Sequence, residues 1–168
     1  MKISTDIKGK WLKLFNRIDD LNQIIDNLPE DFRIVYTYGA WDLLHPGHIR
    51  FLSRARELGD FLIVGVVSDT PIQDLKGEER PIQTLSERLI IVSSLRIVDA
   101  TIIQPEYDPS DQLQSLKRVS ILTKGDDWEY IPGEETITKL GGKLVKLSYT
   151  EGVSTSYLVS KLSKSLGE

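Results

Sequence analysis

The sequence predicts an α/β fold, a doubly wound parallel sheet with helices on both faces, and three observations support it. Short runs of apolar, often β-branched residues alternate along the chain with segments in which apolar residues recur at helical spacing. The run from Phe61 to Val67 is almost continuously apolar, as expected for a strand covered on both faces. The polar clusters follow predicted strands, and such sheets bind ligands beyond the carboxyl ends of their strands.

The first predicted element is an amphipathic helix from Ile7 to Leu28, whose apolar side chains share one face. We expect residues 1–32 to form an N-terminal helical extension, and residues 33–168 to form the main domain. Packing against that domain or against a second subunit explains the apolar face. A helix that lies on a membrane surface would carry more basic charge, so we expect no membrane partner.

The main domain alternates strands with helices, which predicts that the strands are parallel. The predicted strands occupy residues 33–38, 61–67, 100–103, 119–123 and 143–147. Helices are predicted at about 48–58, after Thr84, after Asp108, before Gly141 and after Ser154. Thr84 and Glu87 have the spacing of a capping box, and Pro109 suits the first position of a helix.

Composition excludes several classes of function. The 168 residues are 40% hydrophobic and 27% charged, which is typical of a globular chain with enough apolar residues for a core. We expect a cytoplasmic protein, because the sequence shows neither a secretory signal nor an apolar run long enough to span a bilayer. There is no cysteine, so a metal would need oxygen or histidine ligands. The net charge of −4 argues against a nucleic-acid partner, and an anionic substrate would need a local basic pocket.

Both histidines of the chain lie in the segment from Tyr36 to His48, which leads from a predicted strand into a predicted helix. The first N–H groups of a helix are unpaired and its dipole favours negative charge, so this turn is suited to bind phosphate. His45 and His48 are three residues apart and can lie on the same side of the first helical turn. Gly47 leaves room for a ligand oxygen. An ordinary surface turn is the alternative explanation for such a pair.

The placement of His45-Pro46-Gly47-His48 after a strand resembles the cytidylyltransferase-like nucleotidylyltransferases, whose HxGH motif binds the phosphates of a nucleoside triphosphate. Several separated motifs agree, and the resemblance extends from about Arg33 to Leu162. It implies a Rossmann-like nucleotidylyltransferase fold over residues 33–168, preceded by the amphipathic helix. It also implies a homodimer.

Two subfamilies are similar to different parts of the chain. Gly125-Asp126-Asp127 and the segment from Thr150 to Thr155 resemble the glycerol-3-phosphate and phosphocholine-type cytidylyltransferases. The loop from Lys76 to Pro81 and the glycine-led strand from Gly141 to Leu147 resemble heptose-1-phosphate adenylyltransferases. Tyr149 stands where the cytidylyltransferases usually have Arg, and Gly125-Asp126-Asp127-Trp128 stands where the adenylyltransferases usually have Gly-Gly-Asp-Tyr. The balance of these motifs slightly favours CTP.

The resemblance implies transfer of a nucleotidyl group to the phosphate of an acceptor, with release of pyrophosphate. The first hypothesis is transfer of CMP from CTP to a phosphorylated polyol or sugar, such as glycerol 3-phosphate, to make a cell-surface polysaccharide precursor. The alternative is an ATP-dependent heptose-1-phosphate adenylyltransferase that makes an ADP-sugar. A third hypothesis is a nucleotide-sensing module that has lost the chemistry, against which the intact histidine pair argues.

The resemblance also assigns roles to residues. The implied catalytic residues are His45, His48 and Lys76. The implied nucleotide-binding residues are Tyr38, Gly39, Ala40, Trp41, Asp42, Gly47, Arg88, Lys124, Asp126, Asp127, Thr150, Gly152, Val153, Ser154, Thr155 and Ser156. The implied acceptor-binding residues are Lys76, Arg80 and Trp128. Mg²⁺ is expected to enter with the triphosphate and not in a site held by the protein alone.

Some of these residues have structural explanations as well. Arg88 suits a structural ion pair as much as a phosphate contact. Ser154, with the two residues after it, could simply cap the last helix, and Trp41 could pack in the core as readily as against a ligand. Asp42, together with Asp126 or Asp127, is a candidate for orienting ribose hydroxyls or for holding Mg²⁺ partly through water.

Overall fold

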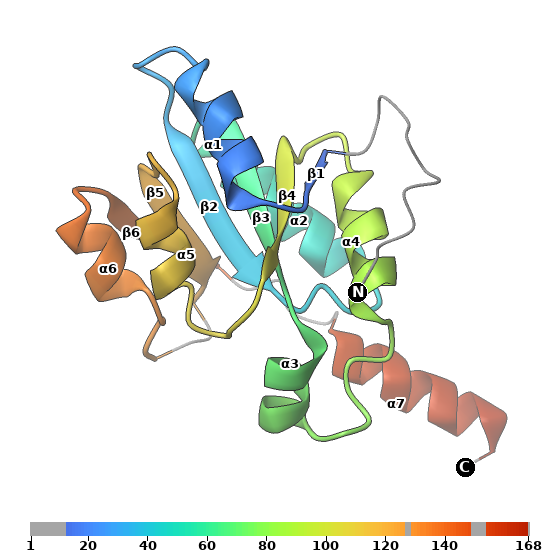
Figure 1. Cartoon of the computed structure of the whole chain (residues 1–168). Helices are drawn as coiled ribbons and strands as arrows, with labels where there is room; N and C mark the ends of the chain where they lie inside the picture. The colour runs from blue at the N-terminus through green and yellow to red at the C-terminus, as the bar shows by residue number, and fades with distance from the viewer. Residues whose placement is uncertain (1–12, 127–128, 149–153, 168) are drawn as a thin grey trace.

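The computed structural model describes residues 13–126, 129–148 and 154–167 (Figure 1). Within these ranges the chain forms one six-stranded sheet with the order β1-β4-β3-β2-β5-β6, and every neighbouring pair of strands is parallel. The strands are β1 (Leu14–Phe15), β2 (Ile34–Gly39), β3 (Phe61–Val67), β4 (Ala100–Gln104), β5 (Ile121–Gly125) and β6 (Lys143–Leu147). The predicted parallel α/β sheet is confirmed.

Helices cover both faces of the sheet, as the doubly wound arrangement requires (Figure 1). One face is covered by α1 (Ile18–Asp26), α5 (Ser110–Ser115) and α6 (Glu134–Lys139), and the other by α2 (Pro46–Glu57) and α4 (Leu85–Ser93). Two further helices, α3 (Asp69–Lys76) and α7 (Thr155–Leu166), lie beyond the carboxyl ends of the strands. None of the helices in the described ranges is long and apolar enough to cross a membrane.

Strand β2 shows how the two cores arise. Ile34, Tyr36 and Tyr38 are buried in the core beneath α1, α5 and α6, while Val35 between them is buried in the core beneath α2 and α4. Successive side chains of a strand point to opposite faces, so a strand with helices on both sides is apolar at every position. This is why β3 is recognisable in the sequence as a continuous apolar run, and β2 as a run of β-branched and aromatic residues.

The N-terminal part differs from the predicted helix over residues 7–28. Leu14 and Phe15 form the short strand β1, which pairs with β4, and the helix begins only at Ile18. The two side chains pack on opposite faces of the sheet, Leu14 on the α4 side and Phe15 on the α1 side. An extended conformation therefore lets both Leu14 and Phe15 pack against a core, and it also gives the outer edge of β4 a hydrogen-bonded neighbour. Residues 1–12 lie outside the described part, and the division of the chain at residue 33 stays a prediction.

Helix α1 itself is amphipathic, as predicted. Its inward residues Leu21 and Ile25 are 0% and 2% exposed and belong to the core, while Asp19 and Asp20 lie in its exposed first turn. In the described part of the chain, the apolar face of this helix is therefore covered by the protein's own sheet.

The order of the strands determines where a ligand can bind. From β2 the chain proceeds to β3 and β4 on one side, and then returns to place β5 and β6 on the other side of β2. The connections that leave β2 and β5 therefore diverge to opposite faces of the sheet, and a crevice opens between them at the carboxyl ends.

Candidate active site

A cavity of about 800 Å³ lies at the carboxyl ends of β2 and β5. It is bounded by the turn after β2, the first turn of α2, the end of α3 with the loop that follows, the end of β5 and the start of α7. The predicted site residues that line it are Tyr38, Gly39, Ala40, Trp41, Asp42, His45, Gly47, His48, Lys76, Arg80, Lys124, Ser154, Thr155 and Ser156. Segments up to 118 positions apart in the sequence, from Tyr38 to Ser156, thus meet at one place.

The two histidines stack on each other at the start of α2. Their ring centroids are 3.8 Å apart with an angle of 20° between the ring planes. His45 is the N-cap residue and Pro46 occupies the first helical position, so the free N–H groups of the helix lie beside the rings. Among the described residues, neither buried Nδ1 atom has a hydrogen-bond partner.

Burial keeps both imidazoles neutral near pH 7. It lowers the pKa of His45, and it lowers the pKa of His48 to about 3, with smaller contributions from the neighbouring charges of His45 and Lys76. A neutral imidazole can still donate one N–H to an anionic oxygen. A bound phosphate would also favour the protonated ring, so binding of an anion and protonation of the pair would be coupled.

Trp41 holds the turn that leads to the histidines. It is 6% exposed, its Nε1 donates to the carbonyl of Gly65 at 3.0 Å, and its ring lies edge-on to His48 at 5.4 Å between centroids. A Cβ at Gly39 would lie 3.1 Å from the Trp41 ring, so only glycine fits there without displacement. The sequence allowed Trp41 either to pack in the core or to contact a ligand. Its contacts show that it packs, and it also lines the cavity.

The turn is strained at two residues. Trp41 has φ of 54° and Leu43 has φ of 44°, in the left-handed region that side chains rarely adopt. Such conformations typically cost about 1–3 kcal/mol each and persist where surrounding contacts hold them. Here one of those contacts is the backbone N–H of Leu43, which donates to Gln83 Oε1 at 2.9 Å.

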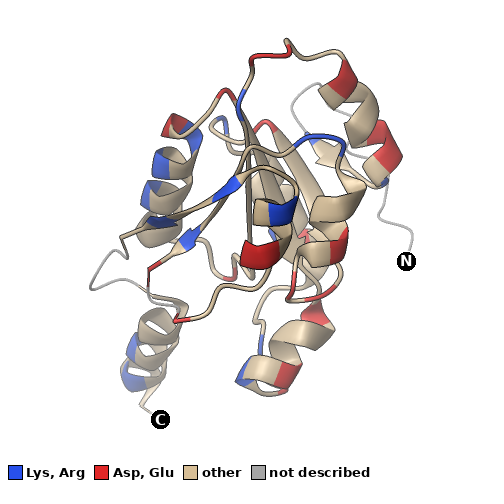
Figure 2. Cartoon of the chain, turned by 90° about the vertical axis from the view of Figure 1, so that its left-hand side faces the viewer, with Lys and Arg blue, Asp and Glu red and all other residues tan. Residues whose placement is uncertain are grey.

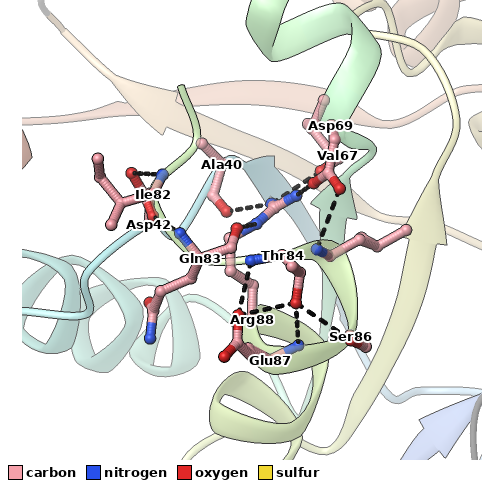
Figure 3. Close-up of polar contacts among 11 residues, drawn as sticks. Ala40, Asp42, Val67, Asp69, Ile82, Gln83, Thr84, Ser86, Glu87 and Arg88 are labelled. Atoms are coloured by element: carbon pink, nitrogen blue, oxygen red, sulfur yellow. Dashed lines mark hydrogen bonds and ion pairs between the residues drawn. The ribbon is translucent and has the colours of Figure 1, made fainter. Parts of the chain in front are cut away.

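Two predicted cations, Lys76 and Arg80, come from the loop after α3. Lys76 is the exposed last residue of the helix, and Arg80 is half-buried with Nη1 3.7 Å from Asp42 Oδ2. The Asp42 carboxylate also accepts the backbone N–H groups of Ile82 and Gln83 at 3.0 and 2.9 Å (Figure 3). These contacts engage both oxygens of a side chain that the sequence suggested as a ribose or Mg²⁺ contact.

Arg88 is placed differently from the predicted phosphate contact. It is 0% exposed and does not line the cavity. Its Nη1 donates to the carbonyls of Ala40 and Val67 at 2.6 and 2.8 Å, its Nε donates to Gln83 O at 3.1 Å, and its Nη2 pairs with Asp69 (Figure 3). The structural ion pair is therefore the role that the structure supports, because the guanidinium is occupied by groups of the protein.

Lys124 lies at the end of β5, where it is 7% exposed. Its Nζ donates to the carbonyl of Tyr38 at 2.8 Å and lies 3.8 Å from the centre of the Tyr38 ring. A buried ammonium at the cavity wall contributes positive charge where β2 and β5 end. Asp126 follows it, does not line the cavity, and donates its backbone N–H to Leu147 O at 3.0 Å.

The start of α7 closes the cavity on the remaining side. Ser154 accepts the N–H of Tyr157 at 3.1 Å, which is the predicted N-cap, and the Thr155 hydroxyl donates to the carbonyl of Asp42 at 2.8 Å. The remaining predicted residues lie outside the described part of the chain: Asp127, Trp128, Thr150, Gly152 and Val153.

The sequence analysis missed some of the lining residues, namely Phe51, Ile72, Tyr107, Gly125 and Ser148. Phe51 and Ile72 carry no polar signal, and an apolar residue that faces a cavity has the same pattern as one that faces a core. Gly125 and Ser148 lie beside predicted site motifs, at Lys124 and at the segment from Thr150 to Thr155. Their position next to these motifs was the one feature of the sequence that could have identified them.

Among the described residues, the Lys and Arg side chains that line the cavity are Lys76, Arg80 and Lys124, although the whole chain carries a net charge of −4. Helix α2 carries Arg50, Arg54 and Arg56 against one Glu, and the neighbouring strand β6 carries Lys143 and Lys146, while acidic residues gather on α1 (Figure 2). The three cations at the cavity wall, Lys76, Arg80 and Lys124, meet the requirement that the sequence set for an anionic substrate.

Residues 36–161 match the model of the cytidylyltransferase-like family. The chain belongs to this family. It is 36% identical over 138 residues to the bifunctional protein HldE of Geobacter sulfurreducens, a match that covers 81% of the chain and 28% of that relative. It is 41% identical over 133 residues to HldE of Nitrosococcus oceani, covering 78% of the chain and again 28% of the relative. The chain therefore spans little more than a quarter of the length of these two relatives.

Solved structures share the fold. The lipopolysaccharide core biosynthesis protein from Thermoplasma volcanium is 31% identical with a TM-score of 0.63, over 71% of this chain and 99% of that one. A pantoate–β-alanine ligase from Francisella tularensis, at 14% identity, gives a TM-score of 0.60 over 94% of this chain and 80% of that one. The first comparison supports kinship within the family, and the second shows only that the Rossmann-like nucleotidylyltransferase fold is shared.

Proposed function

We propose that this protein transfers the adenylyl group of ATP to a phosphorylated sugar and releases pyrophosphate. The observation that carries the proposal is the convergence of the stacked pair His45 and His48, the start of α2, and the cations Lys76, Arg80 and Lys124 on one cavity at the switch point of the sheet. This arrangement suits two anions that must be brought together.

The relatives favour ATP over CTP as the nucleotide of this proposal. The motifs at Gly125 and Thr150 slightly favoured CTP, but the relatives named HldE lie on the heptose side of the resemblance, together with the Lys76 to Pro81 loop. The relative with a solved structure is named for lipopolysaccharide core biosynthesis. The earlier preference for CTP is therefore not supported, and a sugar 1-phosphate with ATP becomes the first proposal.

The chemistry asks mainly for positioning and charge neutralisation. A phosphate oxygen of the acceptor forms a bond to the α-phosphorus of ATP, the bond from that phosphorus to the bridging oxygen breaks, and pyrophosphate leaves in line. An acceptor phosphate is anionic near pH 7, so no general base or covalent intermediate is needed. The protein lowers the barrier by aligning the two phosphates and by stabilising the negative charge that develops in the transition state.

The residues divide this work. His45 and His48 donate N–H groups to the triphosphate beside the N-terminus of α2, which also favours negative charge. Lys76 and Arg80 approach from the opposite loop and neutralise the repulsion between acceptor and nucleotide. Among the described residues, no group of three or more Asp, Glu or His side chains could hold a metal ion. We propose that Mg²⁺ arrives with ATP, where it neutralises phosphate charge.

Pyrophosphate release tests the proposal. The full chain is assayed with Mg²⁺ and either ATP or CTP against glycerol 3-phosphate, other polyol phosphates, and hexose and heptose 1-phosphates. We expect release with ATP and a sugar 1-phosphate. Release with CTP and a polyol phosphate would restore the cytidylyltransferase hypothesis. Nucleotide binding without release from any acceptor in the panel would instead favour a module that lost the chemistry.

We also propose that the protein is a cytoplasmic homodimer. The resemblance to the family is what supports the dimer. The apolar face of α1 does not support it, because that face packs on the protein's own sheet. Sedimentation of the full chain tests it directly, and we expect about twice the 19.0 kDa of one chain. A mass of a single chain at micromolar concentration would reject the dimer.

A further inference from the structure

Asp42 connects three walls of the cavity. Its Oδ2 accepts the N–H of Ile82 at 3.0 Å and its Oδ1 accepts the N–H of Gln83 at 2.9 Å (Figure 3). Arg80 Nη1 lies 3.7 Å from Oδ2, and the backbone carbonyl of Asp42 accepts the hydroxyl of Thr155 at 2.8 Å. One residue of the turn after β2 thus binds both the loop after α3 and the start of α7.

The loop that carries Lys76 and Arg80 has few other attachments. Residues 76–79 are exposed, Gly77 has φ of 94°, and no atom lies within 4 Å of the place where its Cβ would be. The far end of the loop is held at Ile82 and Gln83, by Asp42, by the Arg88 contact to the Gln83 carbonyl, and by the Leu43 N–H that donates to Gln83 Oε1. The place of Arg80 at the cavity therefore depends on the contacts made by Asp42.

We propose that Asp42 is a positioning residue for the transfer reaction, which holds the Lys76 to Gln83 loop so that Arg80 faces the bound phosphates. The inference rests on the proposed function. The contacts favour this role for Asp42 over that of a ligand of ribose or of Mg²⁺, because the residue is 4% exposed and each of its carboxylate oxygens already accepts a backbone N–H. Its negative charge instead orients the Arg80 guanidinium, whose remaining N–H groups can meet substrate oxygens.

Kinetics of Asp42→Asn test the proposal. The variant loses the charge and presents an NH₂ group to one of the two backbone N–H donors, so the attachment of the loop to Asp42 should weaken. Small misplacements of a positioning group can cost about 100-fold in rate, and we expect kcat/KM for the acceptor to fall about 10- to 100-fold. The Mg²⁺ concentration at half-maximal rate should not change. A several-fold rise in that concentration would overturn the proposal, because it would show a metal-ligand role.

A matched control lies at the opposite end of the sheet. Asp60 Oδ2 accepts the backbone N–H of Arg33 at 2.9 Å and lies 3.7 Å from Arg33 Nε, before β2 and β3 begin. Asp60→Asn removes the same kind of contact far from the cavity and should leave kcat/KM unchanged. In an Arg80→Gln background, Asp42→Asn should cost less than in the natural chain, because part of its effect acts through Arg80. Equal costs in both backgrounds would contradict the coupling.

Hydrogen exchange separates this proposal from the proposed function. In the free full chain, the amides of Ile82 and Gln83 should exchange at least about tenfold faster in Asp42→Asn and unchanged in Asp60→Asn. Unchanged exchange at both amides would overturn the proposal whatever the activity. Faster exchange in Asp42→Asn, together with a natural chain that releases no pyrophosphate, would overturn the proposed function and the catalytic role, but not the attachment of the loop. If Asp42→Asn does not fold, Asp42→Glu is the second variant, because it retains both oxygens and the charge. In Asp42→Glu we expect hydrogen exchange at Ile82 and Gln83 to stay slow, while kcat/KM falls.

Discussion

Replacing Arg88 by Met should destabilise the protein strongly without removing a ligand contact. The side chain is 0% exposed, and its guanidinium donates to carbonyls at the ends of β2 and β3, to Gln83 and to Asp69. Methionine fills most of the same volume but leaves these acceptors without their partner. A buried acceptor without a partner costs about 1–3 kcal/mol, and Asp69, whose side chain is 39% exposed, can turn to water. Three carbonyls lose their donor, and values in the lower part of that range give the total that we expect, about 3–5 kcal/mol.

Urea unfolding at pH 7 measures this loss directly. A loss of 3–5 kcal/mol is a large share of the roughly 5–15 kcal/mol of an ordinary domain, and it should lower the melting temperature by about 10 °C. Arg50→Met is the matched control, because Arg50 is exposed on α2 and should change the free energy of unfolding by less than about 0.5 kcal/mol. If Arg88→Met unfolded like the natural chain but lost nucleotide affinity, the structural role argued here would be refuted and the phosphate role restored.

The remaining predictions concern the histidines and the loop. Replacing His45 or His48 by Ala should lower turnover at least about 100-fold with cooperative unfolding retained, and turnover within twofold of the natural enzyme would refute the phosphate role. Lys76 is exposed, so Lys76→Ala should lower kcat/KM at least about tenfold at an unchanged melting temperature; unchanged kinetics would mean that it is only a solvated surface charge. Burial lowers the pKa of His48 from 6.5 to about 3, so between these values the unfolded chain binds more protons and stability falls as the solution is acidified. From pH 6.5 to 5 this loss should reach about 1–2 kcal/mol, and His48→Asn should flatten that part of the pH dependence of urea unfolding. The same slope in both proteins would contradict the burial of His48.

Short-range patterns were enough to predict most of the secondary structure. Strand β3 is a continuous apolar run, and β2 is rich in β-branched and aromatic residues, because helices cover both faces of these strands. Helix α4 begins where the pair Thr84 and Glu87 predicted, and the structure shows both hydrogen bonds of the capping box. Such signals depend only on side chains within a few residues of one another, so the sequence contains them in full.

The histidine motif could be found in the sequence for the same reason. Its two rings are three residues apart on one helical turn, and a strand followed by a helix start is a local arrangement. Strand β1 could not be found, because two apolar residues fit the helical pattern around them. Only the free edge of β4 and the two covered faces of the sheet decide that Leu14 and Phe15 are extended.

What only the tertiary structure decided is which charged residues reach the cavity. In the sequence, Arg88 and Arg80 are both cations near a loop, yet the first is fully buried among carbonyls and the second lines the cavity. From the sequence, Asp42 is a candidate ligand residue. In the structure its carboxylate accepts the backbone N–H groups of Ile82 and Gln83, which are 40 and 41 positions away in the chain. A charge is buried, paired or left for substrate according to partners that are distant in the chain. The sequence therefore determined the fold class, the family and the histidine pair, while packing decided the role of each remaining charge.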